Sequence, residues 1–157
     1  MKRRTCVLAL LIVSLAGCAS MQPQNVVQVI GADPNLSTLS KLIGDAGLND
    51  TLSGAGPFTV FAPSNEAFKA VPATTMSELA GDKERLKQVL TYHVVPVKAA
   101  SADVKAGNVK TVNGANVAVA KTANFVTVEE ALVTGADKTA TNGVVHVIDR
   151  VLLPPTK

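Results

Sequence analysis

Residues 143–153, with the sequence GVVHVIDRVLL, constrain the fold more than any other part of this chain. A strand with one solvent-exposed face alternates apolar and polar residues, whereas here apolar residues stand at successive positions. Pro154 and Pro155 follow immediately, and proline cannot donate the backbone hydrogen bond that would continue a sheet. The pattern predicts a central strand over residues 143–153 that is covered on both faces.

The remaining sequence divides into a helical first half and a second half made of strands. Apolar residues recur at helical spacing over residues 34–47 and 83–92, with Asp33 and Asp82 placed as N-caps. Residues 26–30 fit either a helix or a strand. The other expected strands are short and lie at residues 58–62, 102–104, 109–112, 117–120 and 125–128. Helices followed by strands indicate an α+β fold rather than an alternating α/β fold.

The first 17 residues have the organisation of an export signal. Lys2, Arg3 and Arg4 precede an apolar run over residues 7–15, which small residues then follow. The run is well short of the roughly 20 residues that a membrane-spanning helix requires. The sequence therefore predicts a cleaved leader over residues 1–17 and not a permanent transmembrane helix.

The end of this leader, Leu15-Ala16-Gly17-Cys18, resembles the lipobox of bacterial lipoproteins. The resemblance implies cleavage before Cys18, lipid attachment to its sulfur, and a tether over residues 18–24. Several acyl chains give stable anchoring where one chain does not. Ala19 in place of an aspartate favours the outer membrane, so we expect an exported protein that is lipid-anchored to the bacterial cell envelope. The alternative is an ordinary cleaved signal that happens to contain a cysteine.

Removal of the leader changes what the charge and the cysteines imply. The full chain has 15 basic and 12 acidic residues and a net charge of +3. Without Lys2, Arg3 and Arg4, the mature chain has 12 of each and is neutral, which argues against nucleic-acid binding. Cys6 leaves with the leader and Cys18 carries the lipid, so neither an internal disulfide nor a cysteine-based metal site is expected.

Three segments of the mature chain together resemble the fasciclin (FAS1) domain. Residues 56–68 (GPFTVFAPSNEAF) resemble its first signature, Tyr92-His93 its central motif, and residues 142–152 (NGVVHVIDRVL) its second signature. They occur in the order and at the spacing of the family, and the resemblance covers about residues 25–155. It implies a twisted β-sandwich or wedge packed against a helical layer, and a role in cell-surface adhesion without catalysis.

Most residues of these signatures have a structural interpretation. Phe58, Val60 and Phe61 are expected in the core, because aromatic and β-branched side chains of a short buried strand bury large areas. Ser64 is placed to cap a short helix that follows the strand. The residues that we interpret as structural are Phe58, Val60, Phe61, Pro63, Asn65, Phe68, His146, Val147 and Asp149.

Tyr92 and His93 are the candidate interaction residues, because the family resemblance implies receptor contact at this motif. A structural role is the alternative. A histidine in the last turn of a helix can bond the final carbonyl groups, and a buried Tyr92 would pair its hydroxyl group with a neighbour.

Neither histidine predicts a metal site or a catalytic centre. His146 and Asp149 face opposite sides of a strand, so we expect His146 to be a core residue with satisfied hydrogen bonds. His93 and His146 have no third ligand at a recognisable spacing. The sequence also lacks a nucleophile elbow, a phosphate loop and a dinucleotide fingerprint, so no catalytic residue and no cofactor is expected.

The sequence thus leaves two functions open. The first is a surface-anchored interaction module, whose partner is another protein, a matrix or envelope polymer, or a second copy of the chain. The second is a carrier of an apolar small molecule such as a carotenoid, which the family resemblance also includes. Residues 97–104 are rich in alanine and valine and are the candidate lining for such a ligand.

Overall fold

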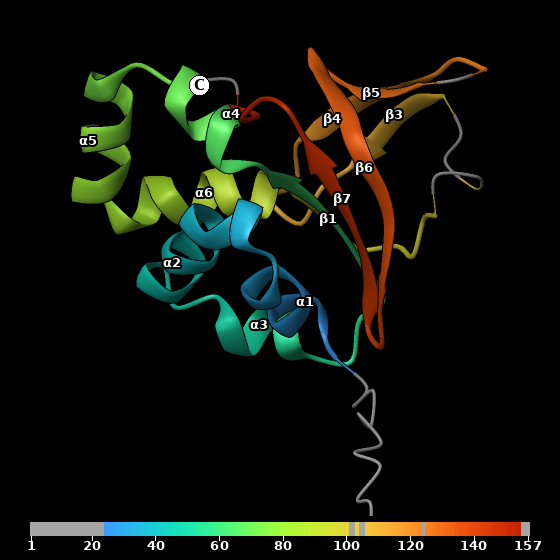
Figure 1. Ribbon diagram of the computed structural model, residues 1–157, viewed down its shortest axis with the longest axis horizontal. Helices are drawn as coiled ribbons and strands as arrows, with labels where there is room; N and C mark the ends of the chain where they lie inside the picture. The colour runs from blue at the N-terminus through green and yellow to red at the C-terminus, as the bar shows by residue number, and fades with distance from the viewer. Residues whose placement is uncertain (1–23, 101–102, 104–105, 124, 155–157) are drawn as a thin grey trace, which may run out of the picture.

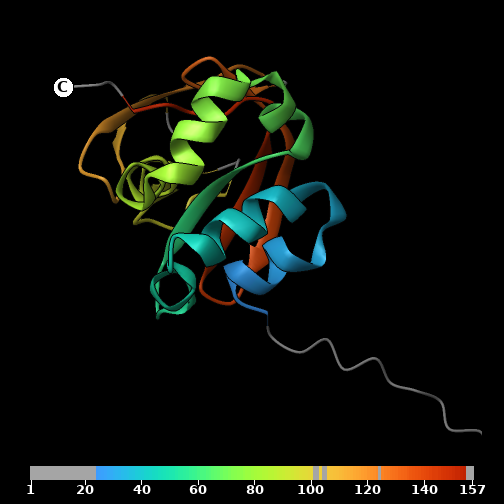
Figure 2. The ribbon, with the colours of Figure 1, turned by 90° about the vertical axis from the view of Figure 1, so that its left-hand side faces the viewer.

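Helices and strands occupy separate regions of the molecule, which confirms the α+β class. The computed structural model describes residues 24–100, 103, 106–123 and 125–154. Its helices are α1 (Val26–Ala32), the 3-10 turn η1 (Pro34–Leu36), α2 (Ser37–Asp45), α3 (Asn49–Ser53), α4 (Asn65–Ala70), α5 (Ala73–Gly81) and α6 (Lys83–Tyr92). Its strands are β1 (Phe58–Pro63), β2 (Val94–Val95), β3 (Gly107–Lys110), β4 (Asn116–Lys121), β5 (Val126–Val128), β6 (Ala131–Ala140) and β7 (Gly143–Ile148). The helices gather on one side of the strands (Figure 1), and Figure 2 looks onto that side.

The strands form one mixed sheet that curves until it is nearly closed. The order is β2-β1-β7-β6-β5-β4-β3. The β1–β7 pair is parallel, and the neighbouring β1–β2 and β6–β7 pairs are antiparallel. After β3 the chain returns to β2, where the Val112 N–H donates to the Val94 carbonyl at 2.8 Å. The two ends of the sheet therefore approach each other, and the wedge-like sheet with a helical layer is the arrangement that the family resemblance implied.

Strands β1 and β7 lie between two apolar cores and contribute side chains to both. Val60 and Val145 pack into the core beneath the helices. Phe61 and Ile148 pack into a second core, which is enclosed by the curved sheet. Every residue of β7 is buried, so the expectation of a central strand covered on both faces is confirmed.

This strand ends at Ile148, however, and not at Leu153 as the apolar pattern predicted. Asp149 is the cause of the earlier ending. Its N–H donates to the Leu132 carbonyl at 3.1 Å, and its carboxylate accepts the Leu132 N–H at 2.7 Å. Because the side chain takes the place of a backbone carbonyl, the chain can leave the ladder after this residue.

Strand β6 is the longest strand of the described chain, and the sequence analysis did not anticipate it. Its sequence contains Gly135 and Asp137, which are residue types that strands disfavour. The register against β7 shifts on both sides of Gly135, so this strand is bulged. Asp137 has a positive φ of 60°. A bulged strand lacks the regular alternation by which strands are recognised in a sequence.

The capping residues fix the helix boundaries as expected. Asp82 accepts the N–H groups of Glu84 and Arg85, and α6 occupies the predicted residues 83–92. Ser64 accepts the Ala67 N–H at 3.2 Å and caps α4. The predicted helix over residues 34–47 is divided into η1 and α2, residues 26–30 are helical, and α3 and α5 were not anticipated.

The predicted short strands have mixed outcomes. Residues 109–112 and 117–120 overlap β3 and β4, and residues 125–128 contain β5. The segment 102–104 lies largely outside the described residues. Phe125, which precedes β5, is 57% exposed and does not belong to the core.

The second signature begins with a residue pair that joins distant parts of the chain. The Asn142 side chain accepts the Val26 N–H at 2.9 Å and donates to the Leu52 and Gly54 carbonyls, each at 2.8 Å. At Gly143 an added Cβ would collide with the Phe58 carbonyl. Asparagine followed by glycine is therefore required where β7 meets the start of β1.

Candidate functional site

Histidine 93 ends α6 and is buried, with 2% of its surface exposed. Its ring joins two backbone segments, because Nδ1 lies 2.7 Å from the Val89 carbonyl and Nε2 accepts the Leu152 N–H at 2.9 Å. Nδ1 therefore carries the proton of a neutral ring. Burial lowers the pKa of His93 to about 4, against the ordinary 6.5.

Tyrosine 92 is also buried, with 3% of its surface exposed. Its hydroxyl group lies 3.3 Å from the Asn116 carbonyl and 3.4 Å from the Glu129 carboxylate. Burial, followed by the negative charge of Glu129, raises the pKa of the Tyr92 hydroxyl. The polar groups of Tyr92 and His93 are thus engaged inside the domain, as the structural interpretation expects. Contact of this pair with a partner stays a prediction.

The polar residues of the second signature hold neighbouring segments. His146 is 2% exposed, its Nε2–H donates to the Ala99 carbonyl at 2.9 Å, and its Nδ1 accepts the Asp137 N–H at 3.3 Å. The ring also stacks on Phe61 with centroids 5.7 Å apart. His146 is therefore a satisfied core residue. It forms no pair with Asp149, which bonds Leu132 instead.

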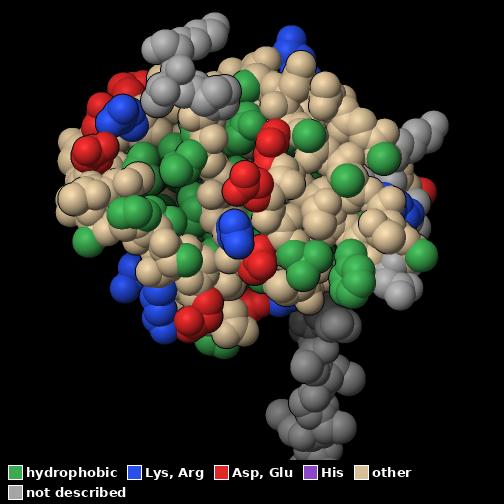
Figure 3. Space-filling model, turned by 90° about the horizontal axis from the view of Figure 1, so that it is seen from above, with side chains coloured by type: hydrophobic (Ala, Val, Ile, Leu, Met, Phe, Trp, Pro, Cys, Tyr) green, Lys and Arg blue, Asp and Glu red, His purple; other side chains and the backbone are tan. Residues whose placement is uncertain are grey.

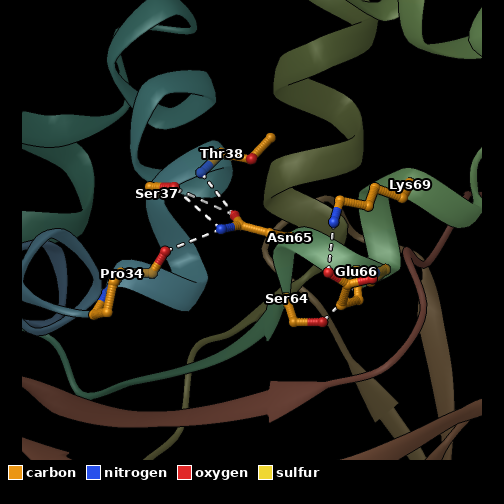
Figure 4. Close-up of polar contacts among 8 residues, drawn as sticks. Pro34, Ser37, Thr38, Ser64, Asn65, Glu66 and Lys69 are labelled. Carbon is orange, nitrogen blue, oxygen red and sulfur yellow. Dashed lines mark hydrogen bonds and ion pairs between the residues drawn. The ribbon is translucent and has the colours of Figure 1, made fainter.

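The first signature builds the junction between β1 and α4. Pro63 ends β1, and Phe68 of α4 is 8% exposed against the helical core. The Asn65 amide donates to the Pro34 carbonyl at 2.9 Å and accepts the Thr38 N–H at 3.0 Å. Figure 4 shows Asn65 reaching to the start of α2, while Lys69 lies over Glu66. Asn65 therefore fixes α4 against the η1–α2 turn.

A groove of about 690 Å³ lies beside this junction, within the usual range of about 300–1,000 Å³ for small-molecule sites. It lies between the η1–α2 turn, α4 and the bulged part of β6. The face seen from above carries neighbouring acidic and basic side chains (Figure 3). The lining residues are Asp33, Asn35, Thr38, Ser64, Asn65, Glu66, Phe68, Lys69, Thr134, Gly135, Lys138 and Val147.

The four charged side chains of the groove form two ion pairs. Lys69 and Glu66 are 2.6 Å apart on the exposed surface of α4. Lys138 of β6 bonds the Asp33 carboxylate, whose other oxygen accepts the Asn35 N–H at 2.9 Å. The Lys138 ammonium group lowers the pKa of Asp33 below its ordinary value. Two acidic and two basic side chains line the groove, so their formal charges cancel.

Sequence reasoning did not find this groove. Asp33 and Lys138 are 105 positions apart in the sequence, and the bulge that carries Lys138 has no recognisable pattern. Asn65 and Phe68 were identified only as structural residues. The repeated occurrence of polar residues around the first signature was the one available signal, and such residues are common at any exposed helix start.

A second cavity of about 470 Å³ lies over Tyr92 and includes Glu129, Arg150 and Leu153. Residues 97–104 were predicted to line a site for an apolar ligand. Part of this segment, residues 101–102 and 104, lies outside the described residues, so the predicted lining is not described in full. Val97, at the start of that segment, is 46% exposed. The carrier function stays a prediction.

Among the described residues, no three His, Cys, Asp or Glu side chains come together as a metal site would require. None of the helices in the same residues has the length and apolar character needed to cross a membrane. The leader and Cys18 lie outside this part of the chain.

Comparisons with known proteins agree on one family. The fasciclin domain profile matches residues 34–154. The protein sll1483 of Synechocystis is 42% identical over 139 residues, covering 87% of this chain and 77% of that protein. The cell surface glycolipoprotein MPB83 of Mycobacterium bovis is 39% identical over 145 residues, covering 88% of this chain and 64% of that protein.

A solved structure supports the fold independently. A FAS1 domain pair from the insect cell adhesion molecule fasciclin I superposes with a TM-score of 0.66. The sequences are 19% identical, and the match covers 83% of this chain and 51% of the insect chain. At this identity the likeness concerns the fold alone.

Proposed function

Because this chain belongs to the fasciclin domain family, we propose that it is a membrane-anchored interaction module of the bacterial cell envelope. Fasciclin domains are adhesion-type modules rather than enzymes, and adhesion without catalysis is the function that we assign here. The partner is a protein, an envelope or matrix polymer, or a second copy of the chain. The family match over most of the chain is the observation that carries this proposal.

The location rests on a different observation, the sequence Leu15-Ala16-Gly17-Cys18. MPB83, which is similar over 88% of this chain, is by its name a cell surface glycolipoprotein. Gln24 is six positions after Cys18, so a tether of this length reaches about 20 Å at most. A lipid on Cys18 would therefore keep the domain close to the membrane surface.

The anchor is tested by replacing each cysteine separately and feeding cells a labelled fatty acid. Cys18→Ala should abolish incorporation of the label and release the protein from the membrane fraction. Cys6→Ala is the matched control, because it removes the other cysteine from the predicted leader and should leave labelling unchanged. Normal labelling of the Cys18→Ala variant would overturn the anchoring proposal.

The adhesion function is tested by deletion and complementation. Cells without the protein should attach less to surfaces or to each other, and the wild-type protein should restore attachment. The Cys18→Ala variant should restore it poorly, because the domain no longer remains at the envelope. Unchanged attachment in the deletion strain, under every growth condition in which the protein is made, contradicts the adhesion function.

A further inference from the structure

The groove between the η1–α2 turn, α4 and β6 has the chemistry of a binding site that the family comparison does not assign. We propose that it binds a neutral carbohydrate segment of an envelope or matrix polymer. This inference rests on the proposed interaction function and deepens it by naming the class of ligand. Three features of the groove support it, namely its paired charges, its small apolar area and its position relative to the tether.

The charged groups of the groove suit hydroxyl groups. A hydroxyl group donates one hydrogen bond and accepts others, whereas a carboxylate only accepts and an ammonium group only donates. In the Glu66–Lys69 pair, an acceptor and a donor lie 2.6 Å apart, with side chains that are 79% and 71% exposed. One sugar hydroxyl can therefore bond both members of the pair without separating them.

The same pairing disfavours a charged ligand. An anion that approached Lys69 would meet the Glu66 carboxylate beside it, and one that approached Lys138 would meet Asp33. The Asp33 carboxylate is only 10% exposed and is already bonded at both oxygens. An ionic ligand would have to break an ion pair and leave a charge without its partner, which a neutral ligand avoids.

The apolar part of the groove is too small for a pigment or a lipid. Its large apolar side chains are Phe68 and Val147, and each is only 8% exposed. This area can contact one C–H face of a sugar ring but cannot cover an extended hydrocarbon. A volume of about 690 Å³ with a polar rim therefore fits a short oligosaccharide segment better than an apolar carrier ligand.

The groove also extends away from the predicted anchor. Gln24, where the described chain begins, is bonded to Thr141 at the β6–β7 turn. On β6, Lys138 of the groove is three residues before Thr141 and Thr134 is seven, which corresponds to about 10 Å and about 20 Å along a strand. Figure 1 accordingly shows α4 at the opposite end of the domain from the start of the described chain. A domain tethered at Cys18 would present the α4 end of the groove outward.

The test uses the full-length protein purified in detergent from its own cells, with NMR-detected titrations. The probes are two neutral trisaccharides, cellotriose and N,N′,N″-triacetylchitotriose, and the anionic trigalacturonate. At least one neutral trisaccharide should bind with a measurable Kd, and trigalacturonate should bind at least fivefold more weakly. Each variant below is first checked for an unchanged melting temperature.

Two variant pairs locate the binding. Thr134→Phe fills the groove from the exposed side of β6, and Thr139→Phe adds the same bulk on the same strand outside it. Lys69→Met removes the donor of the groove pair, whereas Lys87→Met alters the Lys87–Glu84 pair of α6, which has the same i,i+3 spacing. The groove variants should weaken the neutral sugar at least fivefold, and the controls should not change its Kd.

Several results overturn the inference. They are the absence of binding to either neutral trisaccharide, stronger binding of trigalacturonate, and equal effects of Thr134→Phe and Thr139→Phe. A carotenoid or lipid that co-purifies and is displaced by Thr134→Phe also contradicts it. These failures differ from failure of the adhesion proposal, which the deletion strain reports: lost attachment with no sugar binding rejects the groove alone.

Discussion

The Tyr92–His93 corner and the Asp33–Lys138 groove use polar side chains in opposite ways. In the corner, His93 bonds at both ring nitrogens and is 2% exposed, and the Tyr92 hydroxyl faces Asn116 and Glu129. In the groove, the Glu66–Lys69 pair lies on the surface. The polar groups of the corner therefore form their hydrogen bonds within the domain. In the groove, the exposed side chains of the Glu66–Lys69 pair can still bond a ligand.

This difference separates polar residues that the fold uses internally from polar residues that stay accessible to a partner. A buried polar group that is fully paired stabilises one arrangement of the chain and is costly to disturb. An exposed ion pair contributes little to stability and can be altered freely. The comparison predicts that substitutions in and around the corner change stability, while substitutions on the rim of the groove change binding.

The largest effect is expected in the core that contains the corner. Phe61 is 3% exposed, shares this core with Tyr92 and stacks on His146. Phe61→Ala should lower the free energy of unfolding by about 3–5 kcal/mol, through lost burial and the cavity left behind. Chemical denaturation measures the change. Phe125→Ala, at an exposed aromatic, should stay within about 0.5 kcal/mol, and an unchanged midpoint for Phe61→Ala would remove Phe61 from the core.

The next effect is a dependence of stability on pH. His93 has a pKa of about 4 in the folded state against 6.5 ordinarily, so between these values the unfolded chain binds a proton that the folded chain does not. The free energy of unfolding should therefore fall by about 3 kcal/mol as the pH drops from about 6.5 to about 4. Asp33 acts at lower pH, because its pKa lies below 3.8 and its contribution is lost only there.

The variant His93→Gln isolates the contribution of His93 to the pH dependence of the free energy of unfolding. Glutamine can donate and accept but does not titrate, so the variant should lose the part of the slope between pH 6.5 and 4 that His93 causes. Denaturation at a series of pH values gives both slopes. Equal slopes for the two proteins would show that His93 is not the titrating group.

A smaller loss is expected for Tyr92→Phe. The ring stays in the core, and the hydrogen bonds to the Asn116 carbonyl and the Glu129 carboxylate disappear. The free energy of unfolding should fall by about 1 kcal/mol. Attachment of cells in the complementation assay should be retained if the corner is structural. Lost attachment in a stably folded Tyr92→Phe variant would favour the interaction role of Tyr92.

The smallest effect on stability is expected at the rim of the groove. Glu66 and Lys69 are mostly exposed, so the double variant Glu66→Gln, Lys69→Met should change the free energy of unfolding by no more than about 0.5 kcal/mol. The same variant should weaken the neutral trisaccharide. A clear loss of stability would show that the Glu66–Lys69 pair has a structural role like that of Tyr92 and His93, and would contradict the difference drawn between the two regions.

Local signals in the sequence were sufficient for several elements. Asp82 and Ser64 mark helix starts that depend only on a side chain meeting the backbone a few residues later. Continuous apolar residues likewise identified β7 as a central strand. Its early end at Ile148 was not visible, because it depends on a hydrogen bond between Asp149 and the distant Leu132.

The sequence by itself determined the family, the α+β class and some of the core residues, such as Val60 and Phe61, because these follow from local patterns and ordered signatures. Only the tertiary structure decided that Tyr92 and His93 turn inward, that β6 is bulged, and that Asp33 meets Lys138 across 105 positions. The physical reason is that burial and ion pairing depend on which segments become neighbours in space, whereas capping and periodicity depend on neighbours along the chain.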